Sequence, residues 1–391
     1  MGLLSETELR ERVERLAAIE RGSASAGEAQ AAELIAEELR QAGARVRLEA
    51  EDAHGGYWWP VGILTGLTAL AGAFFGRFVA AAAGLFAATA VTDDVTGGKQ
   101  WFRRRFLPKH TTTNVVAEIG PEDAPETVLV IAHHDAAHSG LVFHPELPRN
   151  VLRRFPKLAE NAEATPGTMW GSVYGPLAVA AGAIFGLRAL RGVGIFLCAG
   201  YAAAMADIGA RAVVPGANDN LTGVAVLLSL AQALRDEPVP GLRVILLSTG
   251  SEESFMEGMQ AFGRRHFGDL PRERTQVICL DTLGSPHLLA LEGEGMVWMN
   301  EYSKDVLARV KDAARDLDVF LYPGLRLRNA TDGLIALRAG YPTVTFGSVD
   351  EFKIPTNYHW PTDTPDRVNY GTVADAARLV RELLVRASPP A

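Results

Sequence analysis

Apolar side chains recur at helical spacing in two stretches near the amino terminus, residues 5–19 and 26–42. Apolar and charged side chains alternate between residues 45 and 49, which predicts a half-buried strand. Further strands are predicted at Thr113–Ile119, Thr127–Ala132, Leu242–Leu247, Val277–Leu280 and Pro342–Phe346, and further helices at Leu221–Leu234, Lys304–Leu317 and Val373–Val385. Strands that alternate with helices of this length predict a layered α/β domain around a mostly parallel sheet.

Two stretches, residues 57–92 and 169–206, are apolar almost throughout and do not fit this pattern. Each divides at arginines into two segments, Trp58–Gly76 with Phe78–Thr92 and Met169–Leu187 with Gly192–Ala206. As helices, the first segment of each pair would be about 28 Å long and the second about 22 Å, against roughly 30 Å for a hydrocarbon core. Each stretch predicts a transmembrane helical hairpin; the alternative is a buried hairpin in a soluble core or an oligomer interface.

The composition of the chain limits the classes of partner and the cellular compartment that fit the protein. The chain has 38 basic and 46 acidic side chains and a net charge of -8, which argues against a nucleic-acid partner that needs a basic face. Its two cysteines, Cys198 and Cys279, indicate no disulfide framework and fit a reducing compartment. The amino terminus has a charged, amphipathic helical pattern and lacks the apolar core of a signal peptide.

Side chains suited to binding metal stand at predicted strand ends or in the loops beyond them. They are, in chain order, His133 and Asp135, Asp219, Glu252 and Glu253, Asp281, and Tyr358 with His359. Alternation along a strand places His133 and Asp135 on one side, which suits a metal-binding imidazole whose tautomer a carboxylate fixes. Adjacent carboxylates are costly unless cations or protons balance them. Singly, these residues have ordinary interpretations, such as a helix cap at Asp219, but the ordered set indicates a metal site.

In this order the motifs resemble those of the di-zinc exopeptidases of clan MH, which include bacterial leucyl aminopeptidases, glutamate carboxypeptidase II and glutaminyl cyclases. The resemblance covers roughly residues 20–50, 112–139 and 212–386 and is absent from the two apolar stretches. It implies the zinc exopeptidase fold, a three-layer αβα sandwich around a mixed, mostly parallel sheet. Residues 1–56, 93–168 and 207–391 would then form one discontinuous metallopeptidase domain, interrupted by hairpins at 57–92 and 169–206.

The resemblance also implies roles for the site residues. Two Zn²⁺ ions would be held by His133, Asp219, Glu253, Asp281 and His359. Asp219 would bridge the ions, His133 and Glu253 would complete one, and Asp281 and His359 would be shared among the remaining positions. Glu252 would be the general base. Tyr358 matches the Tyr-His pair of some family members and would donate a hydrogen bond to the oxyanion.

The resulting hypothesis is a membrane-anchored aminopeptidase-type exopeptidase that hydrolyses peptides or acyl amino acids. The alternatives are a non-peptidase amide hydrolase, for example a deacylase of lipidated amino acids, and a non-catalytic membrane scaffold with a relic site. Association with lipid bilayer is expected, nucleic acid is not, and the apolar hairpins offer a surface for oligomer formation.

Charge beside the hairpins predicts their orientation. The hairpin tips carry only Arg77, Arg188 and Arg191, whereas the domain side carries Lys99, Arg103, Arg104, Arg105, Lys109, Arg149, Arg153, Arg154, Lys157 and Arg211. Positive charge concentrates on the inner side of a membrane, which predicts an integral membrane protein with a cytoplasmic catalytic domain. If the first three strands are antiparallel neighbours, both hairpins leave the sheet edge that carries His133. The site is therefore expected to accept substrate from the membrane side.

Overall fold

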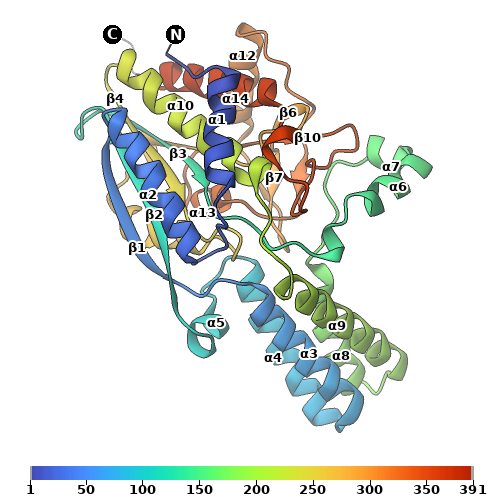
Figure 1. Cartoon of the computed structure of the whole chain (residues 1–391). Coiled ribbons are helices and arrows are strands. Elements are labelled where there is room, and N and C mark those ends of the chain that lie inside the picture. Colours follow the sequence, from blue (N-terminus) through green and yellow to red (C-terminus); the bar gives the residue numbers. More distant parts are fainter. Residues whose placement is uncertain (1, 389–391) are drawn as a thin grey trace.

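The computed structural model describes residues 2–388 and has a seven-stranded sheet at its centre (Figure 1). The strands are ordered β1 (Arg45–Ala53), β2 (His110–Ile119), β4 (Leu242–Thr249), β3 (Glu126–His133), β5 (Thr275–Leu280), β10 (Thr343–Val349) and β6 (His287–Ala290). The four central strands β4, β3, β5 and β10 are parallel, and the outer strands pair antiparallel. The mixed, mostly parallel sheet confirms the predicted fold class.

Two hydrophobic cores cover the two faces of the sheet because successive side chains of each strand point in opposite directions. On β3, Val128 and Val130 join the core beneath α1 (Glu6–Ala17), α2 (Ala26–Gln41), α10 (Thr222–Asp236), α12 (Lys304–Asp316) and α14 (Tyr370–Ala387). Leu129 and Ile131 join the opposite core beneath α11 (Glu257–His266) and α13 (Asp332–Arg338). This is the three-layer arrangement expected of the family.

The strand order corrects one expectation. The first and second strands are antiparallel neighbours, as expected, but β4 lies between β2 and β3. The short link from Ile119 to Glu126 therefore passes over a strand instead of closing a hairpin. Since β1 and β4 are both antiparallel to β2, and β3 is parallel to β4, the carboxyl ends of β1, β3 and β4 still share one edge. The first apolar stretch follows β1 at that edge, and the second follows β3.

The apolar stretches form two helical hairpins that pack into a four-helix bundle projecting from the α/β domain (Figure 1). The helices are α3 (Trp58–Phe74), α4 (Arg77–Val95), α8 (Trp170–Ile184) and α9 (Arg188–Gly209). By length and composition, α4 and α9 could cross a membrane, and α3 and α8 are shorter apolar helices. The termini of the described chain lie at the opposite end of the molecule. The division of the chain into domains stays a prediction.

The arginines at the hairpin tips belong to the helices instead of lying between them. Arg77 begins α4, Arg188 begins α9, and Arg191 lies in the first turn of α9. Its guanidinium donates to the carbonyl oxygens of Gly72 and Phe75, each at 2.7 Å, at the end of α3. Arg77 donates to the carbonyl oxygen of Ile184 at the end of α8. These bonds satisfy carbonyl groups that a helix end leaves without partners, and they tie the two hairpins together.

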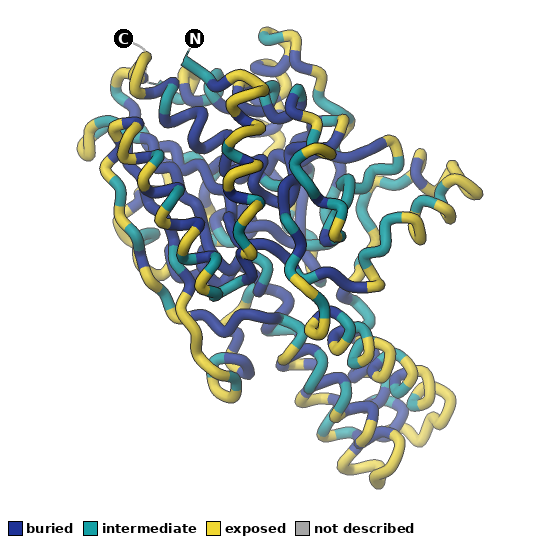
Figure 2. The backbone as a smooth tube through the Cα atoms, viewed as in Figure 1, coloured by how far each residue is buried: buried dark blue, intermediate teal, exposed yellow. Residues whose placement is uncertain are grey.

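Much of the outer surface of the bundle is exposed (Figure 2), and small residues lie at several of the contacts between its helices. A Cβ atom placed on Gly84 would lie 2.5 Å from the carbonyl oxygen of Pro176, and one on Gly194 would lie 2.5 Å from the backbone nitrogen of Val179. The outer surface exposes the apolar residues Leu67, Leu70, Phe74, Phe75, Phe78, Val79, Leu85, Phe86, Phe185, Leu190, Val193 and Phe196. This distribution is the reverse of a water-soluble bundle, in which large apolar side chains fill the core.

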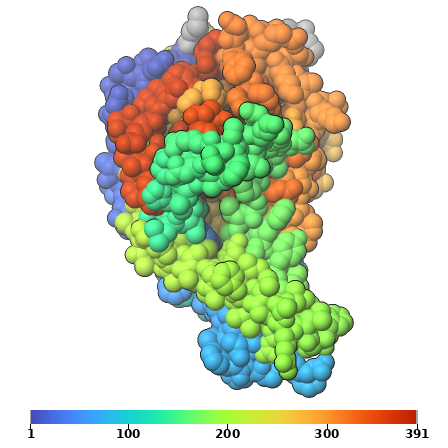
Figure 3. Space-filling view, turned by 90° about the vertical axis from the view of Figure 1, so that its right-hand side faces the viewer, coloured from blue at the N-terminus to red at the C-terminus, as the bar shows by residue number. Residues whose placement is uncertain are grey.

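The segment between the site strand and the second hairpin crosses one face of the molecule above the bundle (Figure 3, green). It contains the 3-10 turn η1 (Leu141–Phe143) and the short helices α6 (Glu146–Arg154) and α7 (Lys157–Glu160). No residue of α6 is buried, and the sequence pattern did not predict these elements. The end of this segment pairs through Ala164 with Arg326 of a small three-stranded sheet, formed by β7 (Gly293–Glu294), β8 (Asn300–Glu301) and β9 (Arg326–Leu327).

Candidate active site

Four of the five predicted metal ligands meet around Asp219. Its Oδ1 lies 3.2 Å from Nε2 of His133, and its Oδ2 lies 3.2 Å from Nε2 of His359. Nε2 of His359 is also 3.2 Å from Oε2 of Glu253. Donor atoms of His133, Asp219 and Glu253 all lie within 4.8 Å of one another, although these residues are 86 and 34 positions apart in the chain. The fold therefore gathers the ligand set at the carboxyl edge of the parallel strands, where open α/β sheets place their sites.

Asp135 organises the strand end that carries the glutamate pair. Its carboxylate accepts hydrogen bonds from the backbone nitrogens of Glu252 at 3.0 Å and Glu253 at 3.1 Å, and from the Ser23 hydroxyl at 2.6 Å. One of its oxygens also lies 3.4 Å from Nδ1 of His133. The carboxylate thus faces the imidazole from the side opposite Asp219, as an orienting residue would.

Buried polar groups hold the loop that presents Asp219. The Asp363 carboxylate accepts from the backbone nitrogens of Asn218 at 2.8 Å and Asp219 at 3.1 Å. Arg21 is fully buried and donates to the carbonyl oxygens of His134, Pro215 and Gly216, which join the two site-bearing segments. The peptide bond between Asp219 and Asn220 is cis.

The electrostatics of the site show an excess of buried negative charge. Burial, and then the charge of Asp219, raise the pKa of Asp281 to about 8. Burial also raises the pKa of Glu252 well above its usual value; His133 opposes this shift, and Asp332 and Glu253 add to it. Burial alone would lower the pKa of His359, but the carboxylates of Glu253 and Asp219 raise it to about 10. The pKa values of these carboxyl groups and of His359 are all raised. Such shifts indicate that the site can bind cations, because bound cations would balance the buried negative charge.

The donor set fits zinc. Imidazole nitrogens and carboxylate oxygens are zinc ligands, and His133 and His359 both direct Nε2 towards Asp219. Oε1 of Glu253 is buried without a hydrogen-bond partner among the described residues. An orphaned carboxylate oxygen of this kind is costly unless a cation binds it.

The other predicted site residues lie close by with less direct contacts. Asp281 ends β5, and its charge interacts with Asp219, His133 and Glu253. The Tyr358 ring stacks on His359 with centroids 3.8 Å apart, and its hydroxyl accepts from the Asn329 amide at 3.0 Å.

Sequence reasoning missed several polar residues that support the site. Besides Arg21, Ser23 and Asp363, they include Asp332, which accepts a hydrogen bond from the Thr249 hydroxyl at the end of β4. Burial raises the pKa of Asp332 to about 7. Phe143 was missed as well, and its ring lies 4.6 Å from that of His359. The one local signal in the sequence was that Asp363 stands four positions after the motif residue His359.

A buried ionic network joins the first hairpin to the glutamate loop. Arg103 in α5 (Trp101–Phe106) binds both oxygens of Asp94 on α4 at 2.7 and 2.8 Å and donates to the carbonyl oxygen of Ser254 at 2.6 Å. It also lies 3.3 Å from Glu257, which in turn binds Nδ1 of His54 at 3.0 Å. Arg103, Asp94 and Glu257 are buried. The hairpin base is therefore part of the support for Glu252 and Glu253.

Removal of this arginine should strongly destabilise the protein. In Arg103→Met, the buried carboxylates of Asp94 and Glu257 lose their cation, a change that typically costs about 3–5 kcal/mol. A calorimetric melting experiment in detergent should show the loss, and Arg103→Met combined with Asp94→Leu should recover part of it. The matched control is Arg153→Met, because Arg153 and its partner Glu146 are half exposed and such pairs contribute about 0–1 kcal/mol. Equal melting temperatures of the Arg103→Met and Arg153→Met variants would contradict the role of Arg103 in supporting the loop of Glu252 and Glu253.

Comparisons with known proteins bear on the family and the fold. The sequence model described as "Peptidase family M28" matches residues 203–384. The protein YfbL of Escherichia coli (strain K12), described as uncharacterized, is 28% identical over 196 residues. That match covers 44% of this chain and 59% of YfbL, so the chain spans less than two thirds of its curated relative.

Solved structures are similar over almost the whole chain. A leucine aminopeptidase precursor from Bacteroides thetaiotaomicron has 14% identity and a TM-score of 0.58, with 98% of this chain and 97% of that chain covered. The zinc aminopeptidase BSAP from Bacillus subtilis has 15% identity and a TM-score of 0.59, with 100% and 97% covered. The glutaminyl cyclase of B. thetaiotaomicron has 14% identity and a TM-score of 0.59, with 98% of each chain covered.

The chain has the fold of these zinc-dependent aminopeptidase structures, and its buried His133, Asp219 and Glu253 could hold a metal ion. Residues 203–384 match the model of Peptidase family M28, in agreement with the family predicted from the motifs.

Proposed function

We propose that the protein is a membrane-anchored di-zinc exopeptidase of the aminopeptidase type. The observation that carries this proposal is the position of Asp219, whose two carboxylate oxygens each lie 3.2 Å from a different histidine. A carboxylate placed in this way can bridge two ions. The M28 match and the aminopeptidases among the similar structures support peptide hydrolysis.

The contacts favour a particular division of the ligands between two zinc ions. Glu253 and His359 share the Oδ2 side of Asp219, whereas His133 stands on the Oδ1 side. We assign Glu253 and His359 to one ion, and His133 with Asp281 to the other. This differs from the first expectation, in which His133 and Glu253 complete the same ion. Zinc bound there would lower the pKa of water to about 7 and polarise the scissile carbonyl.

The chain's own residues supply the proton transfer and the orientation. Glu252 lies 3.9 Å from Nε2 of His133, its side chain is 11% exposed, and its raised pKa suits a general base that later returns the proton to the leaving amine. Asp135 orients His133. Tyr358 accepts a hydrogen bond from Asn329, which leaves its hydroxyl proton free to donate to an oxyanion.

Membrane anchoring is supported by the outer surface of the bundle. Phe78 at the hairpin tip is 81% exposed and Phe196 on α9 is 77% exposed. Exposed apolar surface of this extent marks contact with lipid or protein, and small residues at the helix contacts are typical of membrane helices. Orientation with the catalytic domain in the cytoplasm rests on the basic flanks. Of these, Arg103 is buried in its ion pair and belongs to the fold.

Aromatic residues at the bundle base come close to the site and support substrates with apolar groups. Tyr57, just before α3, packs on Phe255 with ring centroids 4.9 Å apart, and Phe255 follows the glutamate pair by two residues. Phe143 packs on His359. Such a wall suits apolar peptides that first partition into the bilayer. It equally suits lipidated amino acids, so a deacylase is the second candidate function, and a scaffold with a relic site is the third.

The deciding experiment compares free and blocked substrates on the full chain in detergent. The expected result is rapid hydrolysis of leucyl and phenylalanyl p-nitroanilides, loss of activity after treatment with a chelator, and recovery with zinc. The N-acetylated forms should react far more slowly, because an aminopeptidase requires a free α-amine. Preference for N-acyl amino acids would favour the deacylase, and no turnover of either class by zinc-loaded protein would favour the scaffold.

A further inference from the structure

A basic cavity of about 590 Å³ opens beside the base of the first hairpin, outside the active site. It lies between the loop after α4, helix α5, the end of α11 and the end of α13. Four cationic residues line it: Lys99, Arg104, Arg264 and Arg338. Its remaining lining includes the apolar side chains of Phe267 and Ile335.

The cations of this cavity have no carboxylate in direct contact among the described residues. Across residues 2–388, none of the four cations forms an ion pair with a carboxylate. Arg104 donates to the carbonyl oxygen of Lys99, and Arg338 donates to that of Thr96 at the end of α4. Burial and the neighbouring charge of Arg104 lower the pKa of Arg264, and the more distant carboxylates of Glu51, Glu257 and Asp52 oppose this shift only in part. In a chain with a net charge of -8, four unpaired cations around one cavity stand out.

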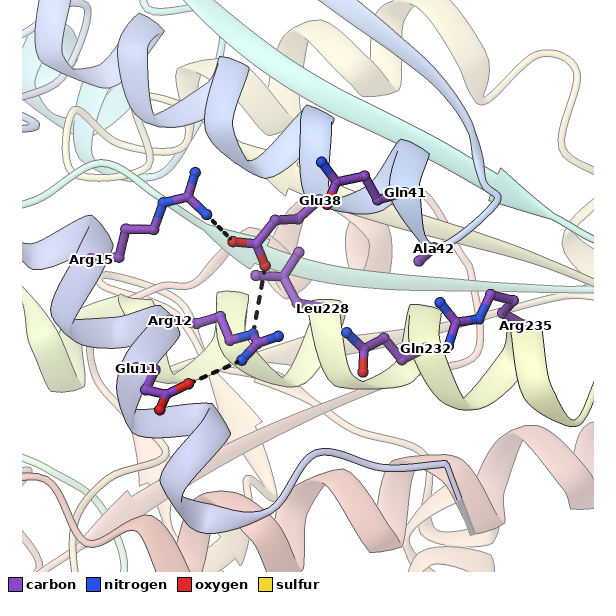
Figure 4. Close-up of a pocket in the computed structure, with 9 residues that line it drawn as sticks. All are labelled: Glu11, Arg12, Arg15, Glu38, Gln41, Ala42, Leu228, Gln232 and Arg235. Carbon is purple, nitrogen blue, oxygen red and sulfur yellow. Dashed lines mark hydrogen bonds and ion pairs between the residues drawn. The ribbon is translucent and has the colours of Figure 1, made fainter.

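A second cavity, of about 370 Å³, provides the contrast (Figure 4). It lies among α1, α2 and α10 and is also lined by arginines, but these have acidic partners. Arg15 binds Glu38 at 2.6 Å, and Arg12 lies 3.6 Å from the same carboxylate. The arginines of that cavity are paired with carboxylates of the protein, whereas the four cations beside the hairpin form no ion pair among the described residues.

The surroundings of the basic cavity place it where a bilayer surface would be. The α4 helix ends at Val95, immediately before the cavity loop. Trp101 on α5 packs against Phe86 on α4 with ring centroids 5.5 Å apart. Phe106 at the end of α5 is 59% exposed. Exposed aromatic side chains beside apolar helices are typical of the membrane–water interface.

We propose that this cavity binds the phosphate headgroup of an anionic phospholipid. The four cations would hold the phosphate, and the apolar side chains of Phe267 and Ile335 would contact the adjoining part of the lipid. Basic pockets beside membrane helices on the cytoplasmic side commonly bind such headgroups. The proposal rests on the membrane anchoring proposed above but not on peptide hydrolysis. It also gives the hairpin base, which supports the glutamate loop through Arg103, a contact with lipid.

Two of the cations can be removed without loss of an internal contact. The side chains of Lys99 and Arg264 make no hydrogen bond or ion pair within residues 2–388, so the double variant Lys99→Gln/Arg264→Gln should fold normally. The matched control is Arg12→Gln/Arg15→Gln at the other cavity. Each full-length protein in neutral detergent is titrated with dioctanoyl phosphatidylglycerol, dioctanoyl phosphatidylcholine or inorganic phosphate, and the melting temperature is followed.

Phosphatidylglycerol should raise the melting temperature of the wild type and of the control variant in a saturable, salt-sensitive manner. Phosphatidylcholine should not. Loss of each cation should weaken phosphatidylglycerol binding by about five-fold, so the double variant should bind about 25-fold more weakly. Stabilisation by inorganic phosphate alone at the same concentrations would overturn the lipid proposal in favour of a soluble anion. Equal lipid affinity of the double variant and the wild type would overturn the site.

Two separate measurements distinguish failure of the proposed function from failure of the lipid site. Carbonate extraction of native membranes tests anchoring, and hydrolysis of a soluble aminoacyl substrate in detergent tests catalysis. Neither readout requires the basic cavity. An active, membrane-bound double variant that has lost phosphatidylglycerol affinity is the expected result.

Discussion

Asp219→Ala should abolish both zinc binding and peptidase activity, with turnover falling by about 10³-fold or more. The two oxygens of Asp219 face His133 and His359, so its removal takes one ligand from each proposed ion. A metal ion contributes several kcal/mol of charge stabilisation in the transition state, and each 1.36 kcal/mol is a factor of ten in rate. Zinc content by mass spectrometry and initial rates on an aminoacyl substrate measure the two effects.

Asp219→Asn is the matched control for the loss of side-chain volume in Asp219→Ala. It keeps the shape of the side chain but removes its charge, so it should also lose zinc if the charge holds the ions. Circular dichroism should show that both variants fold, because Asp363 binds the backbone nitrogens of this loop independently of the Asp219 carboxylate. Two zinc equivalents retained in Asp219→Ala would contradict the bridging role.

Much of the fold could be predicted because its elements carry regular patterns. Strand β3 was predicted as Thr127–Ala132 and is Glu126–His133, and α12 was predicted as Lys304–Leu317 and is Lys304–Asp316. The position of β4 between β2 and β3 could not be predicted, because a short link predicts a hairpin and the alternative pairing depends on distant residues. Helix α6 was missed because its apolar side chains pack on no core and prolines interrupt its segment.

Most candidate ligands could be predicted from the sequence because His133, Glu253 and Asp281 stand at or just beyond the ends of parallel strands, whereas Asp219 precedes α10. The residues that hold these ligands in position could not be predicted from the sequence. Asp363 acts through backbone nitrogens, and Arg21 through backbone carbonyl oxygens, so neither needs a particular side-chain partner that a motif would show. The division of ligands between the ions was equally hidden, since it depends on which oxygen of Asp219 faces which histidine. The four-helix bundle could be predicted only in part. The sequence shows its apolar segments, but it does not show which face of each helix packs against the other helices.

Glu252→Gln should keep both zinc ions yet lose about 10²- to 10⁴-fold in turnover, the usual contribution of a general base. Glutamine preserves the shape of the side chain and its backbone nitrogen still donates to Asp135, so the loop should hold its position. It cannot accept a proton from water. The matched variant is Glu253→Gln at the adjacent position, where the side chain contacts His359 and loss of charge should instead release metal. Zinc analysis and kcat for the two variants therefore separate a base from a ligand within one loop. Full activity in zinc-loaded Glu252→Gln would show that another group takes the proton, and Asp332, whose charge acts on Glu252, would be the next carboxylate to test.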